Sequence, residues 1–208
     1  MVKIDVCLWT KNGSLTLPQV LKRIDNVIPA SVVNRRFIVD DFSLDDTKEI
    51  ASKFGYDIIK NCGVGVSDAA NTALNNVETE LFIGVEQDVL LASDFFPKIY
   101  GLMKRSNASI VSGVRVASHP LVGAADFYAL SHDCFCGHSI DNTLYVKHDL
   151  VSVGGFPKVN QKACSDSVLA LKLDKCGLKW SVARDVVSIH LRDSVFQELK
   201  HQYWYGHS

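Results

Sequence analysis

The sequence lacks a surplus of charge of either sign. Its 22 basic and 23 acidic residues leave a formal net charge of −1. Proteins that neutralise many nucleic-acid phosphates usually carry a basic surplus, so we do not expect nucleic acid as a partner. Long apolar runs are also missing, because none approaches the roughly 20 residues that cross a bilayer. Asp5 interrupts the apolar stretch that a signal peptide would need. We therefore expect no membrane span and a cytoplasmic location.

Paired cysteine motifs and a nucleophile elbow are missing as well. Cys134, Cys136 and His138 form a C-x-C arrangement without the second pair that completes most zinc sites, which favours buried thiols in a loop. Without a secretion signal, reduced cysteines are the default. The absence of G-x-S-x-G argues against a hydrolase triad. There is no internal repeat or interdomain linker, so residues 1–208 are predicted to form a single domain with one substantial core.

What the sequence does contain is an alternation of strand and helix patterns. Apolar, β-rich runs predict strands at residues 4–10, 36–41, 56–60, 80–85 and 108–116. Periodic segments between them predict helices at 18–27, 46–54, 67–76 and 93–104. Residues 117–141 show no period and are expected to form a long functional loop. Short strands at 144–147, 179–183 and 186–189 and helices at 166–176 and 195–205 follow. This order predicts a Rossmann-like α/β fold, with a mixed, mainly parallel central sheet and helices on both faces.

Acidic side chains stand at the ends of predicted strands, where open α/β sheets bind their ligands. Asp41 ends one strand, and Glu86 and Asp88 follow another. Oxygen ligands spaced in this way suit Mg²⁺ or Mn²⁺, which bridge substrate phosphates. His190, at the end of a late strand, is a candidate third ligand. An acid–x–acid triplet is a weak signal by itself, and the same residues could be solvated loop acids beside an ordinary histidine.

Asp166 is the remaining acidic residue of interest, because it begins a predicted helix. An acid in the first turn stabilises a helix through capping and the helix dipole. The alternative is a general base that takes a proton from an acceptor hydroxyl. The pattern of residues by itself leaves both interpretations open.

Six motifs in sequence order resemble glycosyltransferase family 2, and the resemblance covers nearly the whole chain. The most specific is VDDFSLDDT at residues 39–47, which is similar to the family's V-D-D-G-S-x-D-x-T. The others are LWTKN at 8–12, GVSDAAN at 65–71, FIGVEQD at 82–88, VGGF at 153–156 and SDSVLALKL at 165–173. The resemblance implies the GT-A fold. It also implies inverting transfer of a hexose from a UDP-sugar donor to a hydroxyl of a glycan or glycoprotein acceptor.

The same resemblance implies residues that bind the nucleotide-sugar donor. Asp41 would bind the base, commonly uracil, in a pocket lined by Trp9 and Thr10. Asn71 belongs to the third motif and would contact the donor, and Glu86 would hold the ribose. These are expectations from the family, residue by residue.

It further implies a metal site and a catalytic base. Glu86 and Asp88, with His190, would hold Mn²⁺ or Mg²⁺ against the pyrophosphate, and Asp166 would activate the acceptor. The chain departs from the pattern at Ala70, where the family has arginine, and at Ser165, where it has glutamate. The first acid of its D-x-D motif is glutamate.

Within the family, the chain also looks like the N-terminal domain of chlorovirus members that decorate the capsid. That similarity implies further domains C-terminal to this chain, and a location in the host cytoplasm. Two other functions stay open. A sugar nucleotidyltransferase would use a glycine-rich loop. Residues 12–18 resemble such a loop only weakly, because they contain one glycine and no arginine. A non-catalytic carbohydrate- or nucleotide-binding domain would leave these acids solvated.

Overall fold

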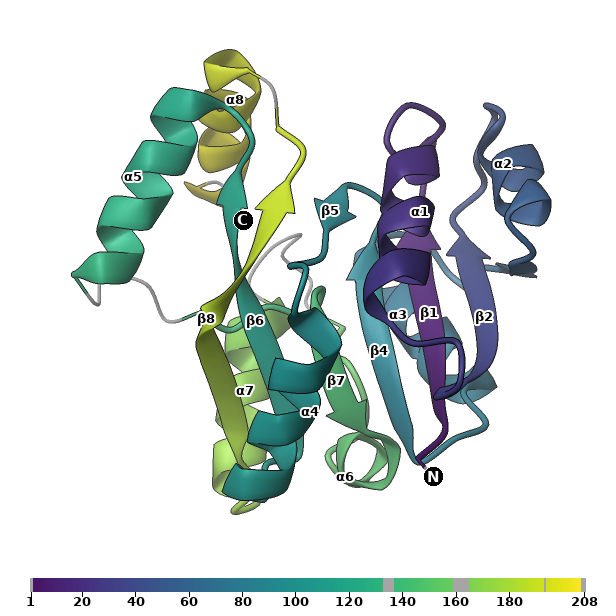
Figure 1. Ribbon diagram of the computed structural model, residues 1–208, viewed down its shortest axis with the longest axis vertical. Helices are drawn as coiled ribbons and strands as arrows, with labels where there is room; N and C mark the ends of the chain where they lie inside the picture. The colour runs from purple at the N-terminus through teal and green to yellow at the C-terminus, as the bar shows by residue number, and fades with distance from the viewer. Residues whose placement is uncertain (1, 133–136, 159–164, 193, 207–208) are drawn as a thin grey trace.

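The computed structural model describes residues 2–132, 137–158, 165–192 and 194–206, and Figure 1 shows how their helices and strands are arranged. The strands are β1 (Ile4–Thr10), β2 (Val33–Asp40), β3 (Asp57–Lys60), β4 (Leu81–Glu86), β5 (Val89–Leu90), β6 (Ile110–Ala117), β7 (Thr143–Val146) and β8 (Trp180–His190). The helices are α1 (Leu17–Val27), α2 (Thr47–Lys53), α3 (Val66–Asn76), α4 (Phe95–Ser106), α5 (Pro120–Ser131), α6 (Lys147–Ser152), α7 (Ser165–Lys175) and α8 (Val195–Gly206).

The described strands form an eight-stranded sheet in the order β3-β2-β1-β4-β7-β6-β8-β5. Strands β1 to β4 run parallel to one another, and β6 runs parallel to β8. Among the strands of the described residues, only β7, between β4 and β6, and β5, at the edge beside β8, pair antiparallel. The predicted mixed, mainly parallel sheet is confirmed. Because the parallel strands end on one side, the loops that follow β1, β2 and β4 meet there.

Two apolar layers cover the faces of the sheet. Successive side chains of a strand point to opposite faces, and β1 shows this directly. Val6 and Leu8 pack with buried residues of α1, α2 and α4, whereas Cys7 and Trp9 pack with those of α3, α6 and α7. Burial on both faces explains why β1 is a continuous apolar run, and it holds the end of this strand rigidly. The expected helices on both faces are confirmed (Figure 1).

Two sequence-based expectations were wrong in the C-terminal part. The stretch predicted as an aperiodic loop contains α5, which begins at Pro120 and runs for twelve residues. Apolar residues lie on all sides of this helix, and only Gly123 is buried. Its sequence therefore shows no helical period of apolar and polar residues. The two strands predicted near the end are one strand, β8, whose pairing with β6 shifts in register between Gly113 and Val114. The short elements β5 and α6 were not predicted.

No helix in the described ranges is long and apolar enough to cross a membrane. The free cysteines include Cys7, which is buried, and Cys62 and Cys176, which are exposed. Cys134 and Cys136, considered above as metal ligands, lie outside the described residues.

Candidate functional site

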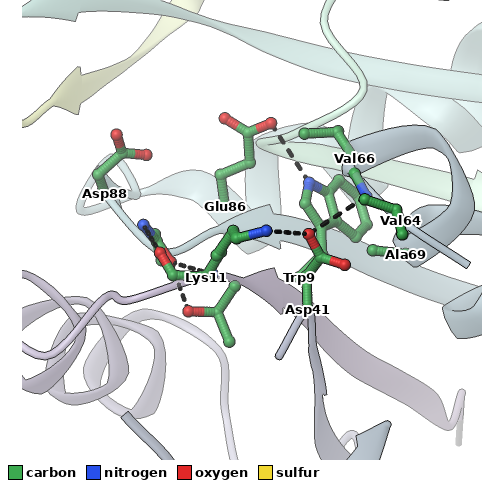
Figure 2. Close-up of a pocket in the computed structure, with 11 residues that line it drawn as sticks. Trp9, Lys11, Asp41, Val64, Val66, Ala69, Glu86 and Asp88 are labelled. Atoms are coloured by element: carbon green, nitrogen blue, oxygen red, sulfur yellow. Dashed lines mark hydrogen bonds and ion pairs between the residues drawn. The ribbon is translucent and has the colours of Figure 1, made fainter. Parts of the chain in front are cut away.

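A pocket of about 320 Å³ opens at the carboxyl ends of β1, β2 and β4, beside the start of α3 (Figure 2). Its apolar lining consists of Trp9, Val64, Val66 and Ala69. Its polar lining consists of Thr10, Lys11, Asp41, Glu86, Gln87 and Asp88. The pocket therefore combines an apolar wall with ionised groups, as sites for amphipathic small molecules do. Five of the residues singled out from the sequence meet here.

Asp41 is a buried carboxylate at one end of this pocket. It accepts hydrogen bonds from Asn61 Nδ2 at 2.8 Å, Lys11 Nζ at 3.1 Å and the backbone N–H of Gly65 at 3.2 Å. Gly65 has φ of 86°, a conformation that L side chains rarely adopt and that aims its N–H at the carboxylate. Burial alone would raise the pKa of Asp41, but the hydrogen bonds and the charge of Lys11 hold this pKa below its usual range. Asp41 is thus an ionised acceptor at neutral pH.

Trp9 joins this end of the pocket to the acids that follow β4. Its indole is buried, and Nε1 donates a hydrogen bond to Glu86 Oε1 at 3.3 Å. Figure 2 shows the indole pointing toward Glu86 and the Lys11 amine pointing toward Asp41. Val64 and Val66, which also line the pocket, leave much of their apolar surface exposed. A flat ligand ring packed against these two side chains would cover that surface.

Glu86, Asp88 and His190 come together as the sequence predicted. One ligand atom from each lies within 4.8 Å of the others. The pairing of Val89 with His190 places the imidazole beside the loop that follows β4, and His190 Nε2 lies 3.0 Å from Asp88 Oδ2. Two carboxylates and an imidazole suit Mn²⁺ or Mg²⁺. The residues present therefore fit the metal that the family resemblance implies.

The carboxylate of Asp88 is ionised by its surroundings. Its partial burial would raise its pKa, but the hydrogen bond and the charge of His190, with the charges of Arg115 and Arg192, outweigh burial and lower the pKa. Arg115 was not singled out from the sequence. Its Nη1 bonds to the buried carboxylate of Asp141 and lies 4.0 Å from Glu86 Oε2. The acids of this site are thus balanced by Arg115 of β6 and by Arg192, which follows β8.

Lys11 and Gln87 are two further residues that sequence reasoning missed. Lys11 is the cation beside Asp41, and Gln87 accepts hydrogen bonds from the backbone N–H of Lys11, at 2.7 Å, and from the Thr10 hydroxyl. Gln87 Nε2 also donates to the Lys11 carbonyl at 3.1 Å. Both residues lie within motifs that were recognised, but their types match no family position, so only the three-dimensional contacts identify them.

Asn71 and Asp166 do not line the pocket. The Asn71 amide bonds to the backbone N–H and carbonyl of Phe156 at 2.9 and 2.8 Å, so it joins α3 to the turn before Phe156. Asp166 lies in the first turn of α7, where its Oδ1 accepts the N–H of Ser167 at 2.9 Å. Its charge also reaches His138. Burial lowers the pKa of that imidazole, although Asp166 acts in the opposite direction.

The family model described as "Glycosyl transferase family 2" matches residues 5–124. The match runs from β1 into α5, so it includes the pocket and the acids after β4 but neither Asp166 nor His190. No curated protein matches the chain significantly.

Several solved structures share the fold. Staphylococcus aureus TarS 1–349 in complex with UDP-GlcNAc is 16% identical, with a TM-score of 0.70 over 93% of this chain and 59% of that chain. Glucosyl-3-phosphoglycerate synthase from Mycobacterium tuberculosis, in complex with Mn²⁺, UDP and glucosyl-3-phosphoglycerate, is 19% identical, with a TM-score of 0.70 over 96% of this chain and 75% of that chain. The same synthase with Mg²⁺ and UDP is 18% identical, with a TM-score of 0.71 over 95% and 74% of the two chains. The chain thus spans less than two thirds of the TarS chain, and at these identities the likeness establishes the fold.

Proposed function

We propose that this chain, which belongs to glycosyl transferase family 2, is a nucleotide-sugar-dependent glycosyltransferase. It would move a hexose from a UDP-sugar to a hydroxyl of a glycan or glycoprotein. The observation that carries this proposal is one crevice that is lined by the ionised Asp41 and by Glu86 and Asp88. The similar solved structures contain UDP with Mn²⁺ or Mg²⁺, or UDP-GlcNAc. Those ligands support the choice of donor.

The base of the donor would bind between Trp9 and the start of α3. There the carboxylate of Asp41 is an acceptor for a ring N–H such as that of uracil. The backbone N–H of Asp41 donates to the Thr10 carbonyl at 2.8 Å, which holds Asp41 in place. Asn71 would act on this donor site indirectly, because its amide is engaged by Phe156. Preorganised acceptors of this kind lower the ordering cost of binding.

Glu86, Asp88 and His190 would hold Mn²⁺ or Mg²⁺, with Glu86 also reaching the ribose. When bound, the metal supplies Lewis-acid stabilisation of the negative charge on the departing diphosphate. The residues themselves contribute carboxylate oxygens, held in place by the hydrogen bonds of Trp9 Nε1 to Glu86 and of His190 to Asp88. This arrangement supports metal dependence.

Asp166 would serve as the catalytic base, at the N-terminus of α7. In an inverting displacement, the acceptor oxygen bonds to the anomeric carbon while the bond from that carbon to the diphosphate oxygen breaks. The proton of the acceptor hydroxyl passes to the Asp166 carboxylate, and UDP leaves. Asp166 is half-buried, so its carboxylate keeps contact with solvent. The resemblance to chlorovirus members, further C-terminal domains and a cytoplasmic location stay predictions.

The sugar nucleotidyltransferase alternative loses support from the loop after β1. A nucleotidyltransferase would use backbone N–H groups of this loop to bind a triphosphate. Here those of Asn12 and Gly13 donate instead to Ser43 Oγ and Thr47 Oγ1, each at 2.8 Å. The N–H of Ser14 donates to the neighbouring loop in the same way. These donors are therefore already used within the protein.

Isothermal calorimetry against UDP, GDP and their sugar conjugates, with and without Mn²⁺, tests the proposal. We expect Mn²⁺-dependent binding of the uridine nucleotides that Asp41→Ala weakens about tenfold or more, because a charged hydrogen-bond acceptor is lost. Asp46→Ala removes an exposed carboxylate nearby and is the matched control. If no nucleotide binds in either condition, the transferase proposal is wrong and a non-catalytic domain is favoured. Release of pyrophosphate, in place of UDP, would favour the nucleotidyltransferase.

A further inference from the structure

We propose that Gln87, which stands between the two acids of the metal loop (residues 86–88), is a positioning residue for the base-binding loop (residues 10–13). The proposal rests on the proposed function, because it concerns recognition of the donor. Gln87 is not itself proposed to touch the metal or the base. It would act through Lys11, by holding the base-binding loop in place against the metal loop.

The first step is the set of contacts that Gln87 makes. Its Oε1 accepts from the backbone N–H of Lys11 at 2.7 Å and from the Thr10 hydroxyl, and its Nε2 donates to the Lys11 carbonyl at 3.1 Å. The side-chain amide thus pairs with both backbone groups of Lys11, as a neighbouring strand would. Backbone groups of an exposed residue could bond to water instead, so this pairing serves to fix the loop in one conformation.

The second step leads from Lys11 to the base site. The Lys11 side chain is about half exposed, yet its Nζ lies 3.1 Å from the buried carboxylate of Asp41. A long, exposed lysine keeps such a contact only if its backbone is fixed, because its side chain has much rotamer entropy to lose. Gln87 therefore acts on the geometry of Asp41 through Lys11, which lies 76 residues away from Gln87 in the sequence.

The third step is the lack of space around the amide. A Cβ atom added to Gly13 would lie 2.7 Å from Gln87 Oε1 and 2.8 Å from Thr10 Oγ1. Both obstacles are polar ends of side chains, so an alanine here would force the Gln87 amide and the Thr10 hydroxyl that it binds to move away. Gly13→Ala is thus a way to displace Gln87 from Lys11 without changing Gln87 itself.

The metal loop has a second, independent connection to the base site, through Glu86 and Trp9. Loss of the Gln87 amide should therefore weaken recognition of the base while leaving Glu86 and Asp88 able to bind a metal–phosphate group. A general disruption of the loop would weaken both equally. This difference separates a positioning role from a merely structural one.

The experiment compares three probes on the full chain by calorimetry: UDP with Mn²⁺, uridine alone, and pyrophosphate with Mn²⁺. Gln87→Met keeps the length of the side chain but removes the amide, and Gly13→Ala displaces it. For both variants we expect the affinities for UDP and uridine to fall about tenfold, as for the loss of one or two hydrogen bonds. The affinity for pyrophosphate should change less than about twofold. Gln19→Ala, at an exposed position of α1, is the matched control and should leave all three affinities unchanged.

The outcomes separate the two proposals. If wild-type protein binds UDP and both variants bind it equally well, the positioning role of Gln87 is wrong, while the proposed function stands. If the affinity for pyrophosphate falls as far as that for uridine, Gln87 supports the metal loop in general, and the inference is again overturned. If the wild-type chain binds none of the probes, the proposed function fails and the inference fails with it. Thermal unfolding of each variant checks that the fold is intact.

Discussion

The two sides of the molecule differ in how their polar and apolar groups are arranged. On the side of β1, β2 and α3, the acids that end the strands are bonded to neighbouring donors before any ligand arrives, as Asp41 is to Lys11. On the side of α5 and α8, which lie beside each other in Figure 1, large apolar side chains such as Leu121 and Phe196 are exposed. The family match covers the first side and ends within α5. The comparison teaches that the proposed base-binding end of the pocket is prearranged within the N-terminal half of the chain, whereas the C-terminal half supplies the candidate metal ligand His190 and the proposed base.

The largest effect is expected when the proposed base, which the C-terminal half supplies, is removed. We expect Asp166→Asn to lower kcat by about 10²–10⁴-fold, because proton transfer in the transition state is lost, with little change in donor affinity. UDP release and calorimetry measure the two effects. Asp174→Asn changes an exposed acid of the same helix and should leave turnover unchanged. Wild-type turnover in Asp166→Asn would remove Asp166 from the mechanism.

A second test concerns the acids after β4. The double variant Glu86→Ala, Asp88→Ala should bind UDP in Mn²⁺ no better than wild-type protein does in chelator, because two of three candidate ligands are gone. The affinity of the variant for UDP without metal should also fall, because Glu86 would hold the ribose, but the affinity that Mn²⁺ adds should disappear completely. Calorimetry with and without chelator measures both quantities. A metal-dependent gain in affinity that survives in the variant would show that these residues do not hold the ion.

A smaller effect is expected at Asp45, which supports the base-binding loop. Its carboxylate accepts from the backbone N–H groups of Ser14 and Thr47 at 3.0 and 3.1 Å. Asp45→Asn should reduce the free energy of unfolding by about 1–2 kcal/mol at pH 7.

The pH dependence of that effect has a definite sign. Burial would raise the pKa of Asp45, but its hydrogen bonds lower it well below the ordinary value of about 4. A carboxylate with a depressed pKa in the folded state stabilises the protein above its unfolded-state pKa, and this contribution is lost as the pH falls through the folded-state pKa. Denaturant unfolding at pH 7 and pH 3 should therefore show the difference between wild type and Asp45→Asn shrinking in acid. A difference that grows in acid would contradict the assignment.

The smallest effect should come from the exposed side of α5. Leu121→Ala removes an apolar side chain that is 73% exposed, so the free energy of unfolding should change by less than about 0.5 kcal/mol. Leu21→Ala, at a fully buried position of α1, is the reference and should cost about 2–5 kcal/mol. Denaturant unfolding compares the two. A large loss of stability in Leu121→Ala would mean that α5 has apolar partners.

Much of the N-terminal half, which contains most of the pocket, could be predicted from the sequence because its structure is indicated by short, local patterns. The apolar run of β1 shows burial on both faces, and Pro18 with Val20, Leu21 and Ile24 shows a helix with one buried face. The grouping of His190 with the acids after β4 was also expected, because parallel strands of one sheet end at the same edge. The roles of Asp166 and Asn71 stay predictions, and neither residue lines the pocket.

The features that were missed depend on contacts between distant segments. Gln87 and Lys11 are ordinary polar residues in the sequence, and their hydrogen bonds appear only when β1 and β4 are paired. Arg115 acquires its place beside Glu86 from the buried Asp141. The helix α5 was missed for a different reason, because its apolar residues occupy every side and leave no period to detect.

The sequence by itself therefore determined the alternation of strands and helices, the acids at the strand ends and the family. Each of these follows from side-chain periodicity or from motifs a few residues long. The tertiary structure alone decided which polar groups pair across the pocket, that Gln87 joins the two loops, and that Asn71 faces the turn before Phe156. The physical reason is that hydrogen bonds and ion pairs depend on distances of about 3 Å between atoms, and such distances are set only when the whole sheet is assembled.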